Sequence, residues 1–291
     1  MTRARAGAVS EDDLETLRAW VGRTVEAEDI VTPNPLARAA ATLDRDDPPP
    51  RPGDPVPPAW HWFFFLPTER QADLGADGHA RRGDFLPPVP LTTRLWAGGR
   101  MRFERPLRVG QAIRRRSEVI RVDPKTGRSG RLVFVTVRHT VSGPDGVATT
   151  EEHDIVYRDP PRPGAKSPDP QPAATQSSWR RSIRADATLL FRFSALTFNG
   201  YRLHYDHRYC DEHGYPGLVV HGPLTVILLL DLVRRERPEL VLKSLDYRML
   251  RALYDTQPFT LAGKHGSGHS LELWAADDHG ALATLASATY A

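Results

Sequence analysis

The sequence predicts an α+β protein made of two similar halves, the first of which is a degraded copy of the second. Three observations support this prediction. Both halves end in two β-rich runs joined by a short turn, a proline-rich segment separates the halves, and one strongly apolar helical run occurs in the second half. We therefore divide the 291-residue chain into a first half at residues 1–158, a linker at 159–177 and a second half at 178–291.

The first half is expected to open with a strand at residues 21–30 and a helix at 33–43, which begins with prolines that suit a helix start. Residues 85–99 carry three prolines and are expected to form only a short helix. Residues 101–122 have β-like patterning, and the alternating runs on either side of residues 142–146 predict a hairpin.

The second half repeats this order. Residues 182–193 are expected to be strand-like, and residues 194–198 to form a short helix. A buried helix is expected to start at Pro223, because its apolar residues occupy nearly all sides for two turns. Further β-like patterning at 244–263 and a hairpin around the turn at 277–280 close the half.

Composition excludes several classes of protein. A single cysteine excludes a disulfide framework, and the longest apolar run, residues 224–230, is far shorter than the roughly 20 residues of a membrane span. Because 35 of the 39 basic residues are arginines scattered among acids, the pI near 9.1 does not indicate nucleic-acid binding. The N-terminus lacks the apolar core of a secretory signal, so we expect a cytoplasmic protein.

The densest polar cluster of the second half contains a candidate base and a candidate oxyanion site. Asn199 and His204 are five residues apart, which on a regular helix places them about 140° apart, so their cooperation requires irregular backbone. Gly200 permits that irregularity. His221 and Gly222 then precede the buried helix, whose first N–H groups suit a polarised carbonyl oxygen. This pairing is the minimum for acid–base chemistry beside a carbonyl.

These segments resemble the MaoC-like (R)-specific enoyl-CoA hydratase/dehydratase family. More narrowly, they resemble its two-hotdog branch, which contains hydroxyacyl-thioester dehydratase type 2 and the mesaconyl-CoA and itaconyl-CoA hydratases. The run FNGYRLHYD departs from the pattern of this branch, FN-x-H-R-[IL]-H-Y-D, only at Tyr201, and GYPGLVVHGPL follows it. Residues 77–111 and 125–139 also look like this branch.

The resemblance implies a double hotdog, in which each half wraps an antiparallel sheet around a central helix and the thioester lies between the halves. It implies that His204 activates water and that the Gly222 N–H polarises the thioester carbonyl. Asn199 takes the place of the aspartate of the general motif. Because an amide cannot titrate, we expect His204 to move the protons alone, with water, or with Asp206. The expected substrate-binding residues are Tyr201, Arg202, Asp206, His221, Lys125 and Arg128.

Aligning Thr32 with Thr188 places Leu43 and Pro48 opposite Asn199 and His204. Leucine and proline cannot perform acid–base chemistry, so we expect the first half to be catalytically silent and each chain to hold one active site.

Three other segments allow more than one interpretation. Lys125, Arg128 and Arg131 suit CoA phosphates, but a solvated turn explains them equally well. The aromatic run at residues 59–67 is expected to be buried core rather than acyl pocket. The run from residue 204 to 213 contains several possible zinc ligands, but their spacings match no common zinc site, so zinc is not expected. These residues are His204, Asp206, His207, Cys210, Asp211 and His213.

The sequence therefore predicts a lyase that hydrates a short, α,β-unsaturated acyl-CoA or dehydrates a 3-hydroxyacyl-CoA. No cofactor is expected beyond the coenzyme A of the substrate, and a monomer and a homodimer both remain open. The alternatives are a hotdog acyl-CoA thioesterase and a non-catalytic subunit that binds acyl-CoA.

Overall fold

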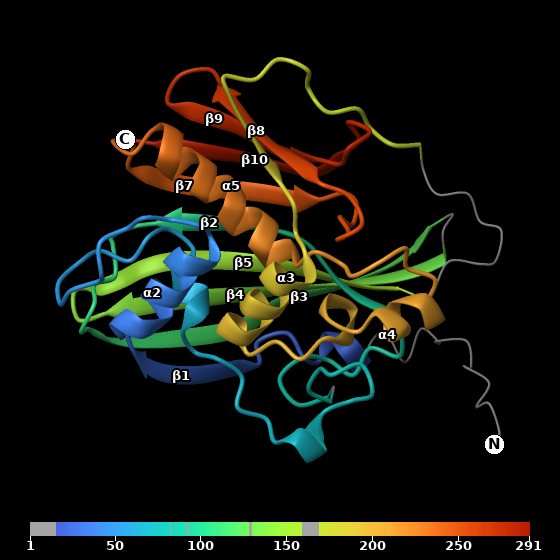
Figure 1. Ribbon diagram of the computed structural model, residues 1–291. Helices are drawn as coiled ribbons and strands as arrows, with labels where there is room; N and C mark the ends of the chain where they lie inside the picture. Colours follow the sequence, from blue (N-terminus) through green and yellow to red (C-terminus); the bar gives the residue numbers. More distant parts are fainter. Residues whose placement is uncertain (1–15, 82, 92, 128–129, 159–168) are drawn as a thin grey trace.

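The computed structural model describes residues 16–81, 83–91, 93–127, 130–158 and 169–291. Its strands form one antiparallel sheet in the order β1-β3-β4-β5-β2-β7-β10-β9-β8-β6 (Figure 1). The strands of the first half make up one end of this order and those of the second half make up the other. The two halves thus share a single sheet.

Four of the five strands of the first half, β1, β3, β4 and β5, overlap the predicted β-rich segments, whereas β2 lies mostly in the segment expected to form a short helix. The hairpin of β4 and β5 turns at residues 144–145, which confirms the first of the two expected hairpins. The bounds of the five first-half strands are β1 Thr24–Ile30, β2 Thr93–Phe103, β3 Ala112–Gly127, β4 Gly130–Gly143 and β5 Gly146–Arg158.

The second half contributes the other five strands, and β9 and β10 form the second expected hairpin. The halves join where residues 98–102 of β2 pair with residues 244–248 of β7. A Cβ at Gly98 would lie 2.4 Å from the Tyr247 carbonyl oxygen, so glycine allows this close approach. The bounds are β6 Trp179–Ile183, β7 Leu242–Met249, β8 Phe259–His265, β9 Ser270–Ala276 and β10 Leu282–Tyr290.

The long apolar helix of the second half is α5, Gly222–Glu236, as expected, with Pro223 as its second residue. Every residue from Leu224 to Val233 is buried, and the helix lies across β7 to β10 (Figure 1). The shorter helices are α2 Pro33–Thr42, α3 Ala187–Thr197 and α4 His207–Glu212, and the 3₁₀ turns are η1 Trp60–Phe63, η2 Gln71–Asp73 and η3 Arg202–His204.

Two expected elements are wrong. The described residues of the segment 85–99 contain no helix, because prolines lacking N–H groups keep residues 85–91 irregular and β2 begins at Thr93. Val89 and Leu91 of this segment are buried and pack in a cluster with valines of β3 and β4. In the second half, the helix begins at Ala187 instead of residue 194, because the Asp186 side chain accepts a hydrogen bond from the Leu189 N–H and caps it.

The aromatic run forms core, as expected. Trp60, Phe63, Phe64 and Phe65 are buried in the same cluster as α5 and the adjoining strands. The turn η1 thus fills space over the first-half sheet that a longer helix fills in the second half.

The structure also shifts the alignment of the halves. Helices α2 and α3 are each followed by a residue in the left-handed region, Asp44 with φ 52° and Phe198 with φ 48°. Matching these two residues places Arg45 and Pro50 opposite Asn199 and His204. These positions are two residues further along the chain than Leu43 and Pro48, which the sequence alignment had placed there.

No helix in the described part of the chain is long and apolar enough to cross a membrane.

Candidate active site

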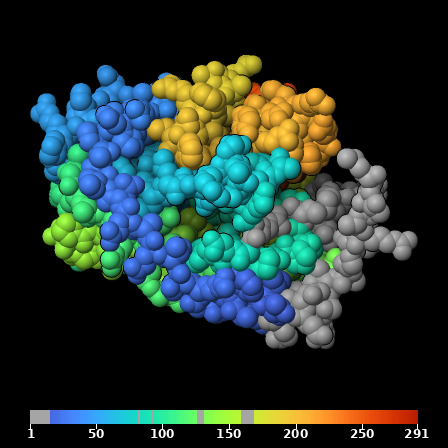
Figure 2. All heavy atoms as spheres, turned by 90° about the horizontal axis from the view of Figure 1, so that it is seen from below, coloured from blue at the N-terminus to red at the C-terminus, as the bar shows by residue number. Residues whose placement is uncertain are grey.

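A cavity of about 1720 Å³ lies between the two halves. The first half contributes residues of the loop before β2, of β2 and of β5, and the second half contributes α3, η3, the start of α5 and the segment after β7. Seen from below, the cyan residues near 70 lie against the yellow and orange helices α3 and α4 (Figure 2). One contact across this boundary is the hydrogen bond of 3.0 Å from the Arg202 N–H to the Asp77 carbonyl.

His204 is a neutral base that faces this cavity. Its ring Nδ1 lies 2.7 Å from the Val219 carbonyl, which can only accept, so Nδ1 carries the proton and Nε2 keeps its lone pair. Burial, with a smaller effect of nearby His79, lowers the pKa of His204 to about 4 against the opposing effect of the Val219 hydrogen bond. A neutral imidazole at physiological pH follows.

His221 supports His204 from behind. The two rings stack with centroids 3.6 Å apart, and Ser194 Oγ lies 2.9 Å from His221 Nε2. His221 is 1% exposed and does not line the cavity, and its expected contact with substrate stays a prediction. Burial and the neighbouring His204 hold the pKa of His221 well below its usual value. Ser194 was not anticipated, because its role depends on a contact 27 residues away.

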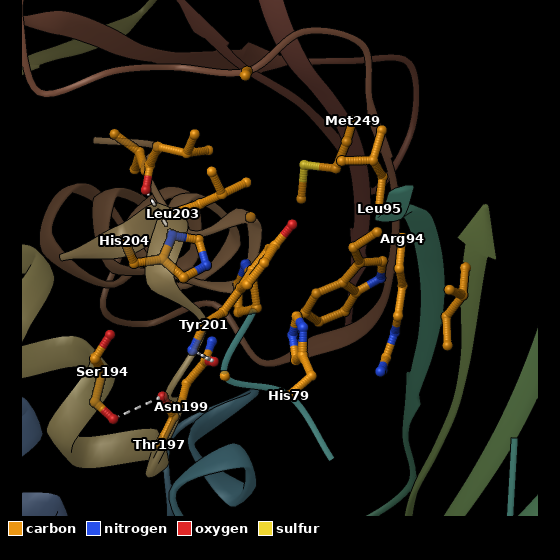
Figure 3. A pocket seen from close by; sticks show the side chains of 18 of the residues that line it. His79, Arg94, Leu95, Ser194, Thr197, Asn199, Tyr201, Leu203, His204 and Met249 are labelled. Carbon is orange, nitrogen blue, oxygen red and sulfur yellow. Dashed lines mark hydrogen bonds between the residues drawn. The ribbon is translucent and has the colours of Figure 1, made fainter. Parts of the chain in front are cut away.

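Asn199 lines the same cavity beyond the end of α3. Its Oδ1 accepts a hydrogen bond of 3.0 Å from the Tyr201 N–H, which turns the chain toward η3 and His204 (Figure 3). The backbone between the two residues is irregular, as their spacing requires. With Oδ1 engaged, the amide Nδ2 is the end of Asn199 that is available to a water molecule or substrate oxygen.

Gly222 also lines the cavity as the first residue of α5. Its N–H precedes the first intrahelical hydrogen bonds, which leaves it available to an oxygen atom. The positive end of a 15-residue helix dipole adds to its attraction for developing negative charge.

Tyr201 and His79 form the wall next to His204. Their rings are 4.1 Å apart, and the Tyr201 ring meets His204 edge-on at 5.5 Å. Figure 3 shows the His204, Tyr201 and His79 rings following one another across the cavity, with Arg94 beyond them. Burial raises the pKa of the Tyr201 hydroxyl, which keeps it protonated. Tyr201 fits the expected position, whereas His79 comes from the first half and was not anticipated.

Arg202 and Asp206 do not line the cavity, and their expected substrate contacts stay predictions. The guanidinium of Arg202 binds the Asp206 carboxylate at 2.7 Å and the Ala76 carbonyl at 3.1 Å. Asp206 also caps α4 by accepting a hydrogen bond from the Tyr209 N–H. These contacts lower the pKa of Asp206 and stabilise the turn that carries His204.

The other possible zinc ligands of this segment do not converge. The Cys210 thiol is buried and donates to the Leu203 carbonyl, His213 Nδ1 lies 2.8 Å from the Tyr209 carbonyl, and His207 faces Asp255. Each of these three groups contacts a local partner of its own.

The residues considered for CoA phosphates lie elsewhere or outside the described residues. Lys125 is exposed in β3, 3.3 Å from the Asp123 carboxylate, and neither it nor Arg131 lines the cavity. Arg128 falls outside the described residues. The arginines that do line the cavity were not anticipated because no linear motif marks them; they are Arg81, Arg94, Arg158 and Arg251.

Comparisons with known proteins agree with this architecture. The sequence profile of hydroxyacyl-thioester dehydratase type 2 matches residues 59–255. Mesaconyl-C(4)-CoA hydratase of Chloroflexus aurantiacus is 43% identical over 272 residues, covering 92% of this chain and 95% of the relative. A solved MaoC-like dehydratase superposes with a TM-score of 0.71 at 14% identity, covering 94% of this chain and 99% of the other.

The fold itself has a direct counterpart. A solved Mycobacterium tuberculosis protein described as a double hotdog covers 96% of this chain and 98% of its own, with a TM-score of 0.57 at 15% identity. The predicted double hotdog is thus confirmed, with the difference that its first half lacks a central α-helix among the described residues. The profile match and the extent of the 43% identity show that the chain belongs to the hydroxyacyl-thioester dehydratase type 2 family.

Proposed function

We propose that this enzyme adds water to the double bond of a short enoyl-CoA whose acyl group carries a second carboxylate. The observation that carries the proposal is the pairing of a buried, neutral His204 with the first N–H of α5 on one cavity. The similarity to mesaconyl-C(4)-CoA hydratase supports the substrate class, because that name describes a dicarboxylic acyl-CoA.

In the proposed reaction, the thioester carbonyl oxygen accepts a hydrogen bond from the Gly222 N–H. His204 Nε2 removes a proton from a water molecule that the Asn199 amide holds, and the oxygen bonds to Cβ. The electron pair of the double bond moves to the thioester oxygen as an enolate, which Gly222 stabilises. His204 then returns the proton to Cα, so the sum is one added water. No cofactor takes part in these steps.

The cavity offers arginine side chains to an anionic substrate, and it is also lined by the carboxylates of Glu69, Asp73, Asp84 and Asp169. Arg94 is half-buried, and within the described part of the chain it forms no ion pair with a carboxylate. Arg81, Arg158 and Arg251 are exposed on the same cavity. Phosphates of coenzyme A and a free acyl carboxylate are the groups that arginine binds most strongly through charge-assisted hydrogen bonds.

The test is His204→Gln, assayed by loss of the enoyl absorbance with mesaconyl-CoA and itaconyl-CoA. General-base catalysis contributes about 10²–10⁴-fold, so kcat/KM is expected to fall by that factor. His207→Gln is the matched control, because His207 is exposed and does not line the cavity. Unchanged hydration in His204→Gln contradicts the assignment of the base.

Two other outcomes contradict the reaction itself. Release of free CoA thiol with the enoyl absorbance intact would identify a thioesterase. Saturable acyl-CoA binding with no turnover of any thioester in the panel would identify a binding subunit.

A further inference from the structure

A belt of polar side chains crosses the inner face of the first-half sheet, away from His204. Side chains alternate along a strand, so Glu151 and His153 of β5 share this face, and His139 of β4 lies directly opposite Glu151. Ser117 of β3 is in turn opposite His139. On one side of the belt along β4 lies Val141, and on the other Val137, each in a separate apolar cluster.

The belt holds a buried carboxylate that faces imidazole rings and, among the described residues, forms no ion pair with an arginine or lysine. The Glu151 side chain is 2% exposed and accepts a hydrogen bond of 2.9 Å from the Trp62 indole. His61 Nε2 and His153 Nε2 approach the same carboxylate oxygen at 3.2 and 3.3 Å, yet neither nitrogen has a well-formed hydrogen bond. Arg115 lies over the Phe65 ring and forms no ion pair with Glu151 among the described residues.

From this arrangement we propose that His139, Glu151 and His153 bind a divalent transition-metal ion of the zinc type. One ligand atom from each residue lies within 4.8 Å of the others. Two imidazoles and one carboxylate are a donor set that zinc and non-haem iron use. The 3.3 Å between His153 Nε2 and Glu151 Oε2 matches the ligand separation of about 3.3 Å that tetrahedral bonds of about 2.0 Å require.

The surrounding groups already hold the ligands as a metal site needs. Ser117 Oγ lies 2.7 Å from His139 Nδ1, which leaves Nε2 to coordinate, and the Trp62 indole N–H holds the Glu151 carboxylate. His153 lines the large cavity, which gives the ion a path of access.

The proposed site is separate from the run of possible zinc ligands at residues 204–213. It lies in the half that lacks the catalytic pair, and the hydration steps above do not use it. Its ligands come from two neighbouring strands. In the linear sequence they form no metal-binding motif, because His139 is isolated and Glu151 and His153 form only a Glu-x-His run.

The experiment uses the full-length protein, stripped with a chelator and then titrated with Zn²⁺ by calorimetry, with bound metal counted by elemental analysis. One Zn²⁺ per chain is expected, and Co²⁺ in its place is expected to give a visible absorption spectrum typical of coordinated imidazole. His153→Gln and Glu151→Gln are expected to lose this binding, whereas His279→Gln, at an exposed turn, is expected to retain it.

Since Glu151 is buried and its variant can fail to fold, His153→Gln is the decisive change, and Ser117→Ala is the test of the supporting contact. Loss of the serine is expected to weaken Zn²⁺ binding about 10–100-fold. Two results would overturn the proposal. They are the absence of saturable Zn²⁺ or Co²⁺ binding to the unaltered protein, and binding in His153→Gln equal to that in His279→Gln.

Discussion

His204 illustrates how burial prepares one residue for its reaction. A histidine with an ordinary pKa near 6.5 is partly protonated just below neutrality, but burial lowers the pKa of His204 to about 4. The lone pair of Nε2 is therefore available over a wider range of pH. Nearby His79 adds a smaller lowering effect on His204, while His204 in turn lowers the pKa of the buried His221 stacked on it.

We predict an acid limb of kcat/KM for hydration with a midpoint near pH 4, and not near 6.5. A base works only when deprotonated, so activity is retained above the lowered pKa of His204 and lost as the pH falls through it. Circular dichroism at each pH establishes that the protein remains folded. An NMR titration of the His204 ring, identified by its absence in His204→Gln, with a midpoint near 6.5 would contradict the prediction.

Among the elements, α5 has two roles: its first residue, Gly222, lines the cavity, and Asp231 further along the helix holds it in the fold. Its buried Asp231 carboxylate contacts Arg45 at 2.6 Å, Arg181 at 2.9 Å and Arg235 at 2.7 Å. These arginines come from the segment after α2, from β6 and from α5 itself. The carboxylate therefore connects α5 with both halves and fixes the helix whose first N–H faces the cavity.

Asp231→Asn is expected to lower the free energy of unfolding by about 3–5 kcal/mol, because it removes the charge of a buried carboxylate that three partly buried arginines share. Asp246→Asn is the matched control, since its ion pair with Arg102 is about half exposed and is expected to contribute less than about 1 kcal/mol. Urea denaturation measures both variants. Equal losses of stability would contradict the importance of the buried network.

For the whole molecule, the central feature is a site assembled from both halves. Gly78 of the first half has φ +90°, and a Cβ there would lie 1.8 Å from the Gly200 carbonyl oxygen. The two backbones therefore meet beside Asn199 and Tyr201. A side chain at residue 78 would separate the halves where the catalytic segment turns.

Gly78→Ala is expected to lower kcat/KM about 100-fold, the usual effect of misplacing a catalytic group by about 1 Å. Gly53→Ala tests backbone strain alone, because Gly53 has φ +88° and a Cβ there would meet nothing within 4 Å beyond its chain neighbours. Steady-state kinetics of the two variants at matched stability separates these causes. A Gly78→Ala enzyme as active as Gly53→Ala would show that this contact does not position the site.

Much of the fold and part of the site follow from local sequence. Alternation and turn residues predict the hairpins, and apolar density predicts α5, since these signals depend on neighbours in the chain. Asn199, His204 and Gly222 lie in a linear motif, and the structure brings them to one cavity.

The remainder depends on contacts that the linear sequence does not reveal. His79, Arg94 and Ser194 reach the site through tertiary packing from three separate segments. Arg202 and Asp206 have the residue types of a binding site, but they lie within hydrogen-bond distance of each other and are engaged there. The burial of Val89 and Leu91 against β3 and β4 likewise involves residues distant in the sequence.

The pairing of β2 with β7 makes a symmetric assembly unnecessary within this chain. In a homodimer of hotdogs, each substitution would appear twice, once in each subunit, and a change useful at one end would be imposed on the other. Covalent fusion removes that restriction. In this chain the second half contains the central helix and the base. The first half has an aromatic turn in place of the helix, and its histidines lie near a buried glutamate. The continuous sheet thus allows the two copies to specialise without coming apart.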